Sequence, residues 1–170
     1  LGVFALSLGA TLTVEDKSAV PAQNDVAIPV WLSAGLDEQV SSLQFDIQFD
    51  DNAITLNSVI LGEAADAAGK DLNYHSLASD AVRVIIVGFN QNVIEDGIIA
   101  DVAMDVDGAA MSGDYPLLLK NVLASDPFGF PVEAQVQDGI LTIFGGEGEG
   151  EGEGEGEGEG EGEGEGEGEG

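Results

Sequence analysis

The sequence contains no cysteine, one histidine and only four Lys and Arg residues among 170. Without cysteine it has neither disulfides nor thiolate ligands, and His75 alone cannot supply the clustered ligands of a zinc site. A nucleophilic triad would also depend on this one histidine, which we interpret as a surface residue. The GxSxG, HExxH, GxGxxG and phosphate-loop motifs are all absent. These absences indicate a protein that is not an enzyme.

The scarcity of Lys and Arg also limits the partners that the protein can bind. The net charge is −29, and removing the twelve Glu of residues 147–170 leaves −17 for residues 1–146. Nucleic-acid phosphates and anionic membrane surfaces are bound through Lys and Arg, so we expect neither as a partner. Glycoside hydrolases use a pair of carboxylates, but such pairs are no evidence of that activity in this sequence. With 21 acidic residues among 146, pairs of carboxylates occur by chance.

The first ten residues, LGVFALSLGA, are apolar and uncharged and end in small side chains. This composition is typical of the end of a secretory signal peptide, and the stretch is too short to span a bilayer. A first core strand is the alternative interpretation. We expect residues 1–10 to be the remnant of a signal peptide and the protein to be secreted or displayed at the cell surface, without membrane insertion.

Residues 147–170 are a strict Glu-Gly alternation. Such a segment has nothing apolar to bury, its Gly residues add backbone entropy, and its like charges repel one another. We therefore expect a disordered low-complexity linker or tail, which leaves residues 11–146 as one folded domain.

The body is rich in short stretches in which apolar and polar residues alternate. In residues 40–49 the apolar side consists of Leu43, Phe45, Ile47 and Phe49, and the polar side of Ser42, Gln44, Asp46 and Gln48. A turn cluster, Asp50–Asn52, separates this stretch from a second apolar run at residues 53–61. Further strand patterns occur at residues 11–14, 25–34, 72–78, 81–89, 97–106, 115–123, 132–136 and 140–144. Since no long window has helical periodicity, the sequence predicts an all-β fold, an antiparallel β-sandwich of about nine strands.

Residues 81–89, AVRVIIVGF, indicate which surface could meet a partner. Arg83 is difficult to bury, so its side of the strand, shared with Ile85 and Val87, should face solvent. The opposite side, which suits the core, consists of Val82, Val84, Ile86 and Gly88. Exposed β-branched residues beside an arginine suggest a sheet face that a partner covers. The alternative is that both faces are buried, for example beneath a loop.

Three stretches of the chain together resemble bacterial cohesin modules, the dockerin-binding domains of cellulosome scaffoldins. The first is NDVAIPVWL at residues 24–32, and the second is LQFDIQFDDNAITLNSVILG at residues 43–62. The third is VRVIIVGFN followed by EDGIIADVAMDV, within residues 82–106. Their order and spacing match the family over about residues 11–144.

The resemblance implies a nine-stranded sandwich with jelly-roll topology and a non-catalytic, secreted function in assembling polysaccharide-degrading or cell-surface complexes. One sheet face would bind a dockerin, which would carry calcium, while this chain would need no cofactor and no metal. Ser42 and Gln44 stand where the family often has Asn-x-Asp. Arg83 joins this face because its side of residues 81–89 is expected to be exposed to solvent. The expected dockerin face then consists of Ser42, Gln44, Tyr74, Ser76, Ala78, Arg83, Ile85, Val87 and Asn90.

Direct binding of polysaccharide, as in a carbohydrate-binding module beside a glycoside hydrolase, is the alternative function. Glycan binding usually needs exposed aromatic side chains. The candidates for such a platform are Trp31, Tyr74, Phe128 and Phe130.

Overall fold

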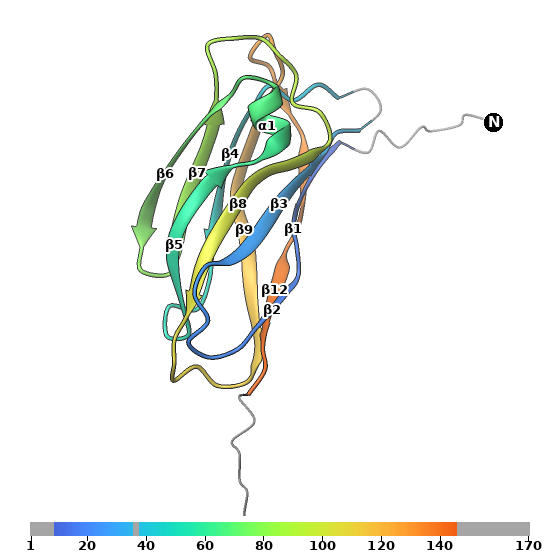
Figure 1. Ribbon diagram of the computed structural model, residues 1–170. Coiled ribbons are helices and arrows are strands. Elements are labelled where there is room, and N and C mark those ends of the chain that lie inside the picture. The colour runs from blue at the N-terminus through green and yellow to red at the C-terminus, as the bar shows by residue number, and fades with distance from the viewer. Residues whose placement is uncertain (1–8, 36–37, 146–170) are drawn as a thin grey trace, which may run out of the picture.

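A computed structural model of the protein describes residues 9–35 and 38–145. In this part of the chain, two β-sheets pack face to face as a sandwich (Figure 1). The five-stranded sheet has the order β11-β1-β3-β8-β5 and consists of β1 (Ala10–Val14), β3 (Val26–Ser33), β5 (Ile54–Leu61), β8 (Gly97–Val106) and β11 (Ala134–Gln137). The all-β sandwich that the alternation predicted is confirmed.

The outer side of the seven-stranded sheet is the candidate partner-binding face. Its main path has the order β2-β12-β9-β4-β7-β6, and β10 pairs with β9 beside that path. Its strands are β2 (Lys17–Ala19), β4 (Ser42–Gln48), β6 (Asp71–Ala78), β7 (Ala81–Val87), β9 (Gly113–Ser125), β10 (Pro131–Val132) and β12 (Gly139–Ile143). One short helix, α1 (Glu63–Ala67), lies against β8 at one end of the sandwich (Figure 1).

The described residues form twelve strands rather than about nine, in part because two short interruptions divide an extended stretch between the sheets. Glu15 and Asp16 separate β1, which belongs to the five-stranded sheet, from β2, which belongs to the other. Glu133 likewise separates β10, paired with β9, from β11, paired with β1. The β1–β11 and β2–β12 pairings are parallel, so the sandwich is not wholly antiparallel. Alternation along a chain shows where strands lie but not which sheet each one joins.

The core between the sheets contains the apolar side of β4, as predicted. The side chains of Leu43, Phe45 and Ile47 are 2%, 0% and 0% exposed. Burial of side chains of this size contributes about 1.5–3 kcal/mol each. The turn after β4 is also present, where the carboxylate of Asp50 accepts hydrogen bonds from the backbone and side-chain amides of Asn52.

The first strand begins at Ala10, which is fully buried and pairs with Ala134. Of the signal-peptide remnant expected at residues 1–10, only Gly9 and Ala10 lie in the described part, and the disorder expected of residues 147–170 falls outside it. In the described part, no helix is both long and apolar enough to cross a membrane.

Replacing Phe45 with Ala should lower the free energy of unfolding by about 3–5 kcal/mol, because the ring is fully buried between the sheets. Urea denaturation measures this change. Phe89 is the matched control, because its ring is fully exposed and Phe89→Ala should change stability by less than about 0.5 kcal/mol. Equal losses in the two variants would contradict the assignment of Phe45 to the core.

A candidate partner-binding sheet face

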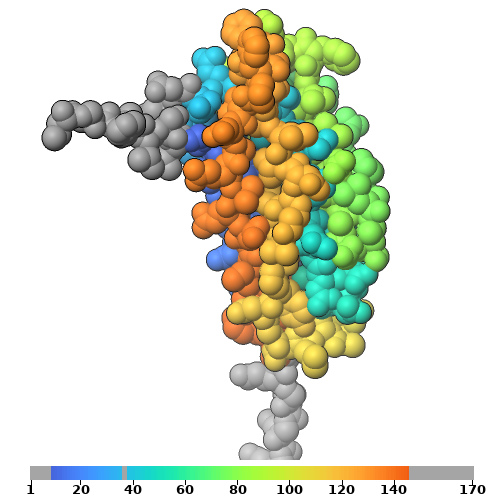
Figure 2. Space-filling model, turned by 180° about the vertical axis from the view of Figure 1, so that it is seen from behind, coloured from blue at the N-terminus to red at the C-terminus, as the bar shows by residue number. Residues whose placement is uncertain are grey.

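The orientation of β7 shows which residues lie on the outer face of the seven-stranded sheet. Val82, Val84 and Ile86 are fully buried, so the alternating residues Arg83 and Val87 point away from the core. This is the orientation that the sequence predicted for the strand. Ile85 shares the outward side and is half-buried. Figure 2 views the molecule from this side, where β9 and β12 (yellow to orange) form a continuous surface with β7 and β6 (green).

The pairing register divides this outer face into rows that run across four strands, because directly paired residues point to the same side. The apolar row consists of Leu123, Gln44, Ile85 and Asn73. The basic row next to it consists of Lys120, Asp46, Arg83 and His75. Sequence reasoning included neither Leu123 nor Lys120 among the site residues, because their position depends on how β9 pairs with β4.

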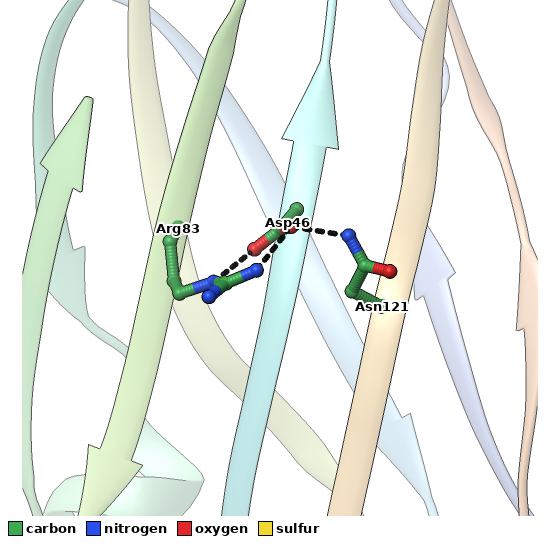
Figure 3. Close-up of polar contacts among 3 residues, drawn as sticks. All are labelled: Asp46, Arg83 and Asn121. Atoms are coloured by element: carbon green, nitrogen blue, oxygen red, sulfur yellow. Dashed lines mark hydrogen bonds and ion pairs between the residues drawn. The ribbon is translucent and has the colours of Figure 1, made fainter. Parts of the chain in front are cut away.

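Asp46 is buried at the centre of the basic row, with 3% of its surface exposed. Arg83 donates from Nε to Oδ1 at 2.6 Å and from Nη2 to Oδ2 at 2.8 Å, and Asn121 donates to Oδ2 at 2.7 Å (Figure 3). The hydrogen bonds from Arg83, supported by the amide of Asn121, hold the pKa of Asp46 below its usual value, although burial acts in the opposite direction. The ion pair therefore joins β4, β7 and β9 on their outer face.

A β-bulge brings Asn121 to this position. The register between β4 and β9 shifts between Gln44 and Asp46, and Asn121 has a φ of 48°. Asn tolerates this left-handed conformation better than most residues, because its short polar side chain bonds locally. The bulge thus brings an amide to Asp46 in addition to the guanidinium of Arg83. A strand prediction from residues 115–123 contains no sign of this bulge.

The two polar residues predicted on β4 lie on the outer face. Gln44 is half-buried between Leu123 and Ile85 in the apolar row. The hydroxyl of Ser42 lies 2.6 Å from that of Ser125, so these two side chains share a hydrogen bond across β4 and β9. Gln44 therefore presents its amide to solvent between two apolar side chains, whereas Ser42 is already paired.

Two of the three residues predicted on β6 lie on the other side of the sheet. Tyr74 pairs with Val84, and Ser76 pairs with Val82, which places both on the side that faces the five-stranded sheet. A bulge between Ser76 and Ala78 then reverses the alternation. The resemblance to cohesins implied all three residues on one face, but the bulge separates Ala78 from Tyr74 and Ser76.

Ala78 pairs with Ala81 at the end of the outer face, beyond that bulge. The residues that β6 contributes to the central rows are Asn73, opposite Ile85, and His75, opposite Arg83. Both are exposed. They replace Tyr74 and Ser76 as candidates for contact with a partner.

Asn90 has a structural role inside the chain. Its Oδ1 accepts a hydrogen bond from Nζ of Lys70 at 2.8 Å, and its Nδ2 donates to the carbonyl of Gly69 at 2.8 Å. Lys70 is 4% exposed and also donates to the hydroxyl of Ser41 at 3.0 Å. Burial lowers the pKa of Lys70. Asn90 therefore anchors the segment that follows β7, and its amide is occupied within the protein.

The four aromatic residues considered for glycan binding do not form one platform. Trp31 lies on β3 in the five-stranded sheet, where its Nε1 donates to Glu15 at 2.9 Å. Tyr74 lies on β6 in the other sheet. Phe128 and Phe130 are exposed in the turn between β9 and β10. A flat stacking surface needs coplanar neighbours, and these side chains belong to three separate regions.

Two depressions of about 700 and 630 Å³ lie at the α1 end of the sandwich and have acidic linings. The carboxylates in the larger one are partly occupied, since Asp96 accepts the backbone N–H of Ala34 and Asp126 those of Phe128 and Phe130. In the described residues, no group of three acidic, His or Cys side chains is placed to hold a metal ion. The outer sheet face remains the best candidate site.

Replacing Asp46 with Asn should remove part of the acid dependence of stability. The folded-state pKa of Asp46 is lowered, so its ionised form contributes stability that is present above about pH 3.9, the usual value for an unfolded chain, and is lost as the pH falls through the folded-state value. The loss of unfolding free energy between pH 7 and pH 3, measured by urea denaturation, should be smaller in Asp46→Asn than in the wild type.

Asp101 provides a control of opposite sign. Burial and the nearby Glu63 raise the pKa of Asp101, so its ionised form destabilises the fold at neutral pH. Asp101→Asn should therefore make the loss between pH 7 and pH 3 larger than in the wild type. Identical pH dependences in the wild type and Asp46→Asn would contradict the role given to the ion pair.

Comparisons with known proteins agree with this fold. The family model described as "Cohesin domain" matches residues 10–129. The sixth cohesin of Acetivibrio cellulolyticus scaffoldin B, solved with a Cel5 dockerin mutant, is 18% identical with a TM-score of 0.72 and covers 80% of this chain and 99% of its own. The OlpA cohesin of Clostridium thermocellum, solved with Doc918, is 15% identical with the same TM-score and coverage.

A non-cellulosomal cohesin from the archaeon Archaeoglobus fulgidus is 17% identical, with a TM-score of 0.68, and covers 80% of this chain and 91% of its own. No curated protein sequence matches the chain. At these identities the solved structures show a shared fold. The family model extends over well more than half of the chain, and cohesin domains are non-catalytic protein-interaction modules. The protein belongs to the cohesin family.

Proposed function

We propose that this protein binds a dockerin domain through the outer face of its seven-stranded sheet. The observation that carries the proposal is the composition of that face, where exposed apolar side chains lie among polar ones that are held in place by the sheet. The face is broad and is formed by adjacent strands (Figure 2). Family membership and the two related cohesins solved with dockerins support the choice of partner.

The apolar part of the face is concentrated toward one end of the strands. Val87 is 41% exposed and Leu123 is 64% exposed, and they lie near the ends of β7 and β9. The next turns add Phe89, Phe128 and Phe130, which are all exposed. Large apolar side chains in such numbers are unusual on a monomer surface, and aromatic side chains are enriched at protein interfaces. A helical partner laid across β7, β4 and β9 would remove them from water.

The proposed contact residues are those that the register places on this side. From the sequence prediction they are Ser42, Gln44, Arg83, Ile85, Val87 and Ala78. We add Asn73, His75, Lys120 and Leu123, because they pair with these residues or with Asp46 on the same side of the sheet. Asn90 acts indirectly, because its hydrogen bonds to Lys70 and Gly69 position the segment that carries Phe89.

The proposed biological role is a non-catalytic module in a secreted or cell-surface assembly, with calcium on the dockerin. Assembly of polysaccharide-degrading enzymes is one such role. The family also includes a non-cellulosomal cohesin, so we extend the proposal to other surface complexes. The Glu-Gly sequence after residue 146 would serve as a spacer to a neighbouring module.

Val87→Asp should weaken dockerin binding by about tenfold or more, because it places a charge in the apolar part of the interface. Calorimetry against a panel of dockerins from the source genome, in the presence of calcium, measures the affinity. Ile60→Asp is the matched control, since Ile60 is 60% exposed on β5 of the other sheet. Both variants should keep the unfolding temperature of the wild type within a few degrees.

Equal binding of the wild type and Val87→Asp would contradict the choice of face. A wild-type protein that binds no dockerin of the panel but is retarded in polysaccharide gels would replace the proposal with carbohydrate binding.

A further inference from the structure

The few basic residues of this protein are not scattered over its surface. The chain has four Lys and Arg residues and one His. Three of these five, Lys120, Arg83 and His75, lie in one row across the seven-stranded sheet. Residues 1–146 carry a net charge of −17, so a row of basic side chains on one face contrasts with the composition of the rest of the chain.

The negative charge within this row is already neutralised. Asp46 is buried, and both of its oxygens accept hydrogen bonds from Arg83 and Asn121 (Figure 3). Its ion pair with Arg83 leaves little net charge at the middle of the row. The remaining charge comes from the exposed Lys120, and the described residues contain no carboxylate within ion-pair distance of its Nζ.

The rows on either side of Lys120 contain no acidic residue at their paired positions. The apolar row on one side of Lys120 contains Leu123, Gln44, Ile85 and Asn73, none of which is acidic. The paired positions on its other side are Leu118, Gln48, Ala81 and Ala78. Asp71 is the acidic residue of β6 on this face, and it lies opposite Val87 at the β6 edge of the sheet. Two carboxylates border these rows but are already hydrogen-bonded, Asp138 to the backbone N–H of Leu119 and Asp80 to the amide of Gln48. Lys120 is thus the cation of the described face that has no ion-pair partner.

We infer that the docking surface of the partner carries a carboxylate that pairs with Lys120 beside the Asp46–Arg83 ion pair, flanked by apolar side chains that cover Leu123 and Ile85. This inference rests on the proposed function and specifies the chemistry of the dockerin that the protein selects. The partner is an acidic one, and its carboxylate is placed at the β9 side of the face.

Charge complementarity of this kind would determine the orientation of the partner as well as its identity. An acidic docking segment is repelled by the many carboxylates elsewhere on the surface, and it finds an unpaired cation only at Lys120 among the described positions of this face. A partner with a basic side chain at the same position would face the unpaired charge of Lys120. Like charges across an interface disfavour binding, so such dockerins would be rejected.

The experiment is a double-mutant cycle with the tightest dockerin of the panel. Lys120→Glu should weaken binding by about tenfold or more, and replacing the matching Asp or Glu of the dockerin with Lys should restore it. Lys17→Glu is the matched control with the same change of charge. Lys17 lies on β2 of the same sheet, but it pairs with the buried Leu141 and bonds to Glu15, which also holds Trp31 of the other sheet. Its side chain therefore lies on the opposite side from the proposed face. The difference between the two variants should shrink at 1 M NaCl.

Each outcome of this experiment either supports or overturns the role of Lys120. The inference is supported if Lys120→Glu weakens dockerin binding more than Lys17→Glu and one Asp-to-Lys or Glu-to-Lys change in the dockerin restores the affinity. Equal losses in Lys120→Glu and Lys17→Glu, or no rescue by any acidic-to-lysine change, overturn it while leaving dockerin binding intact. Failure of the wild type to bind any dockerin overturns the proposed function and this inference together. Unfolding temperatures of both variants show that the fold is retained.

Discussion

Each strand of the seven-stranded sheet uses one side for the core and the other for the surface, and this alternation constrains everything else in the molecule. Phe45 and Val84 are buried together as directly paired residues. Their neighbours Gln44 and Ile85 must therefore point outward. A slip of one residue in this pairing would bury amides and expose the core, so hydrophobic packing also determines which residues a partner can reach.

The buried ion pair of Asp46 and Arg83 adds a polar constraint to the apolar one. Removing a charge from water is costly unless it is paired and hydrogen-bonded, and here both oxygens of Asp46 have donors from adjacent strands. Such a pair favours one register of β4, β7 and β9 over others. It also removes Arg83 from the set of charges available to a partner and leaves that role to Lys120.

The unpaired Lys120 on this face would give this cohesin a chemical preference of its own. The fold is shared with solved cohesins at 15–20% identity, so the sheet is retained while the side chains on it differ. A sheet face of adjacent rows suits such variation, because outward residues can change without disturbing the core on the other side. Selectivity among dockerins would then depend on a few charges surrounded by apolar contacts.

The sequence by itself determined the class of fold, the inward side of β4 and β7 and the family, because alternation and composition are local properties of the chain. It also placed Arg83, Ile85 and Val87 on the outer side. The resemblance grouped Tyr74 and Ser76 with these residues, whereas they pair with Val84 and Val82 on the core-facing side of the sheet, and strand pairing is not a local property of the sequence. Only the tertiary structure decided that Asp46 meets Arg83 and Asn121 and that Lys120 lies beside them. These contacts join residues 37 to 75 positions apart in the chain, and no local pattern records such pairings.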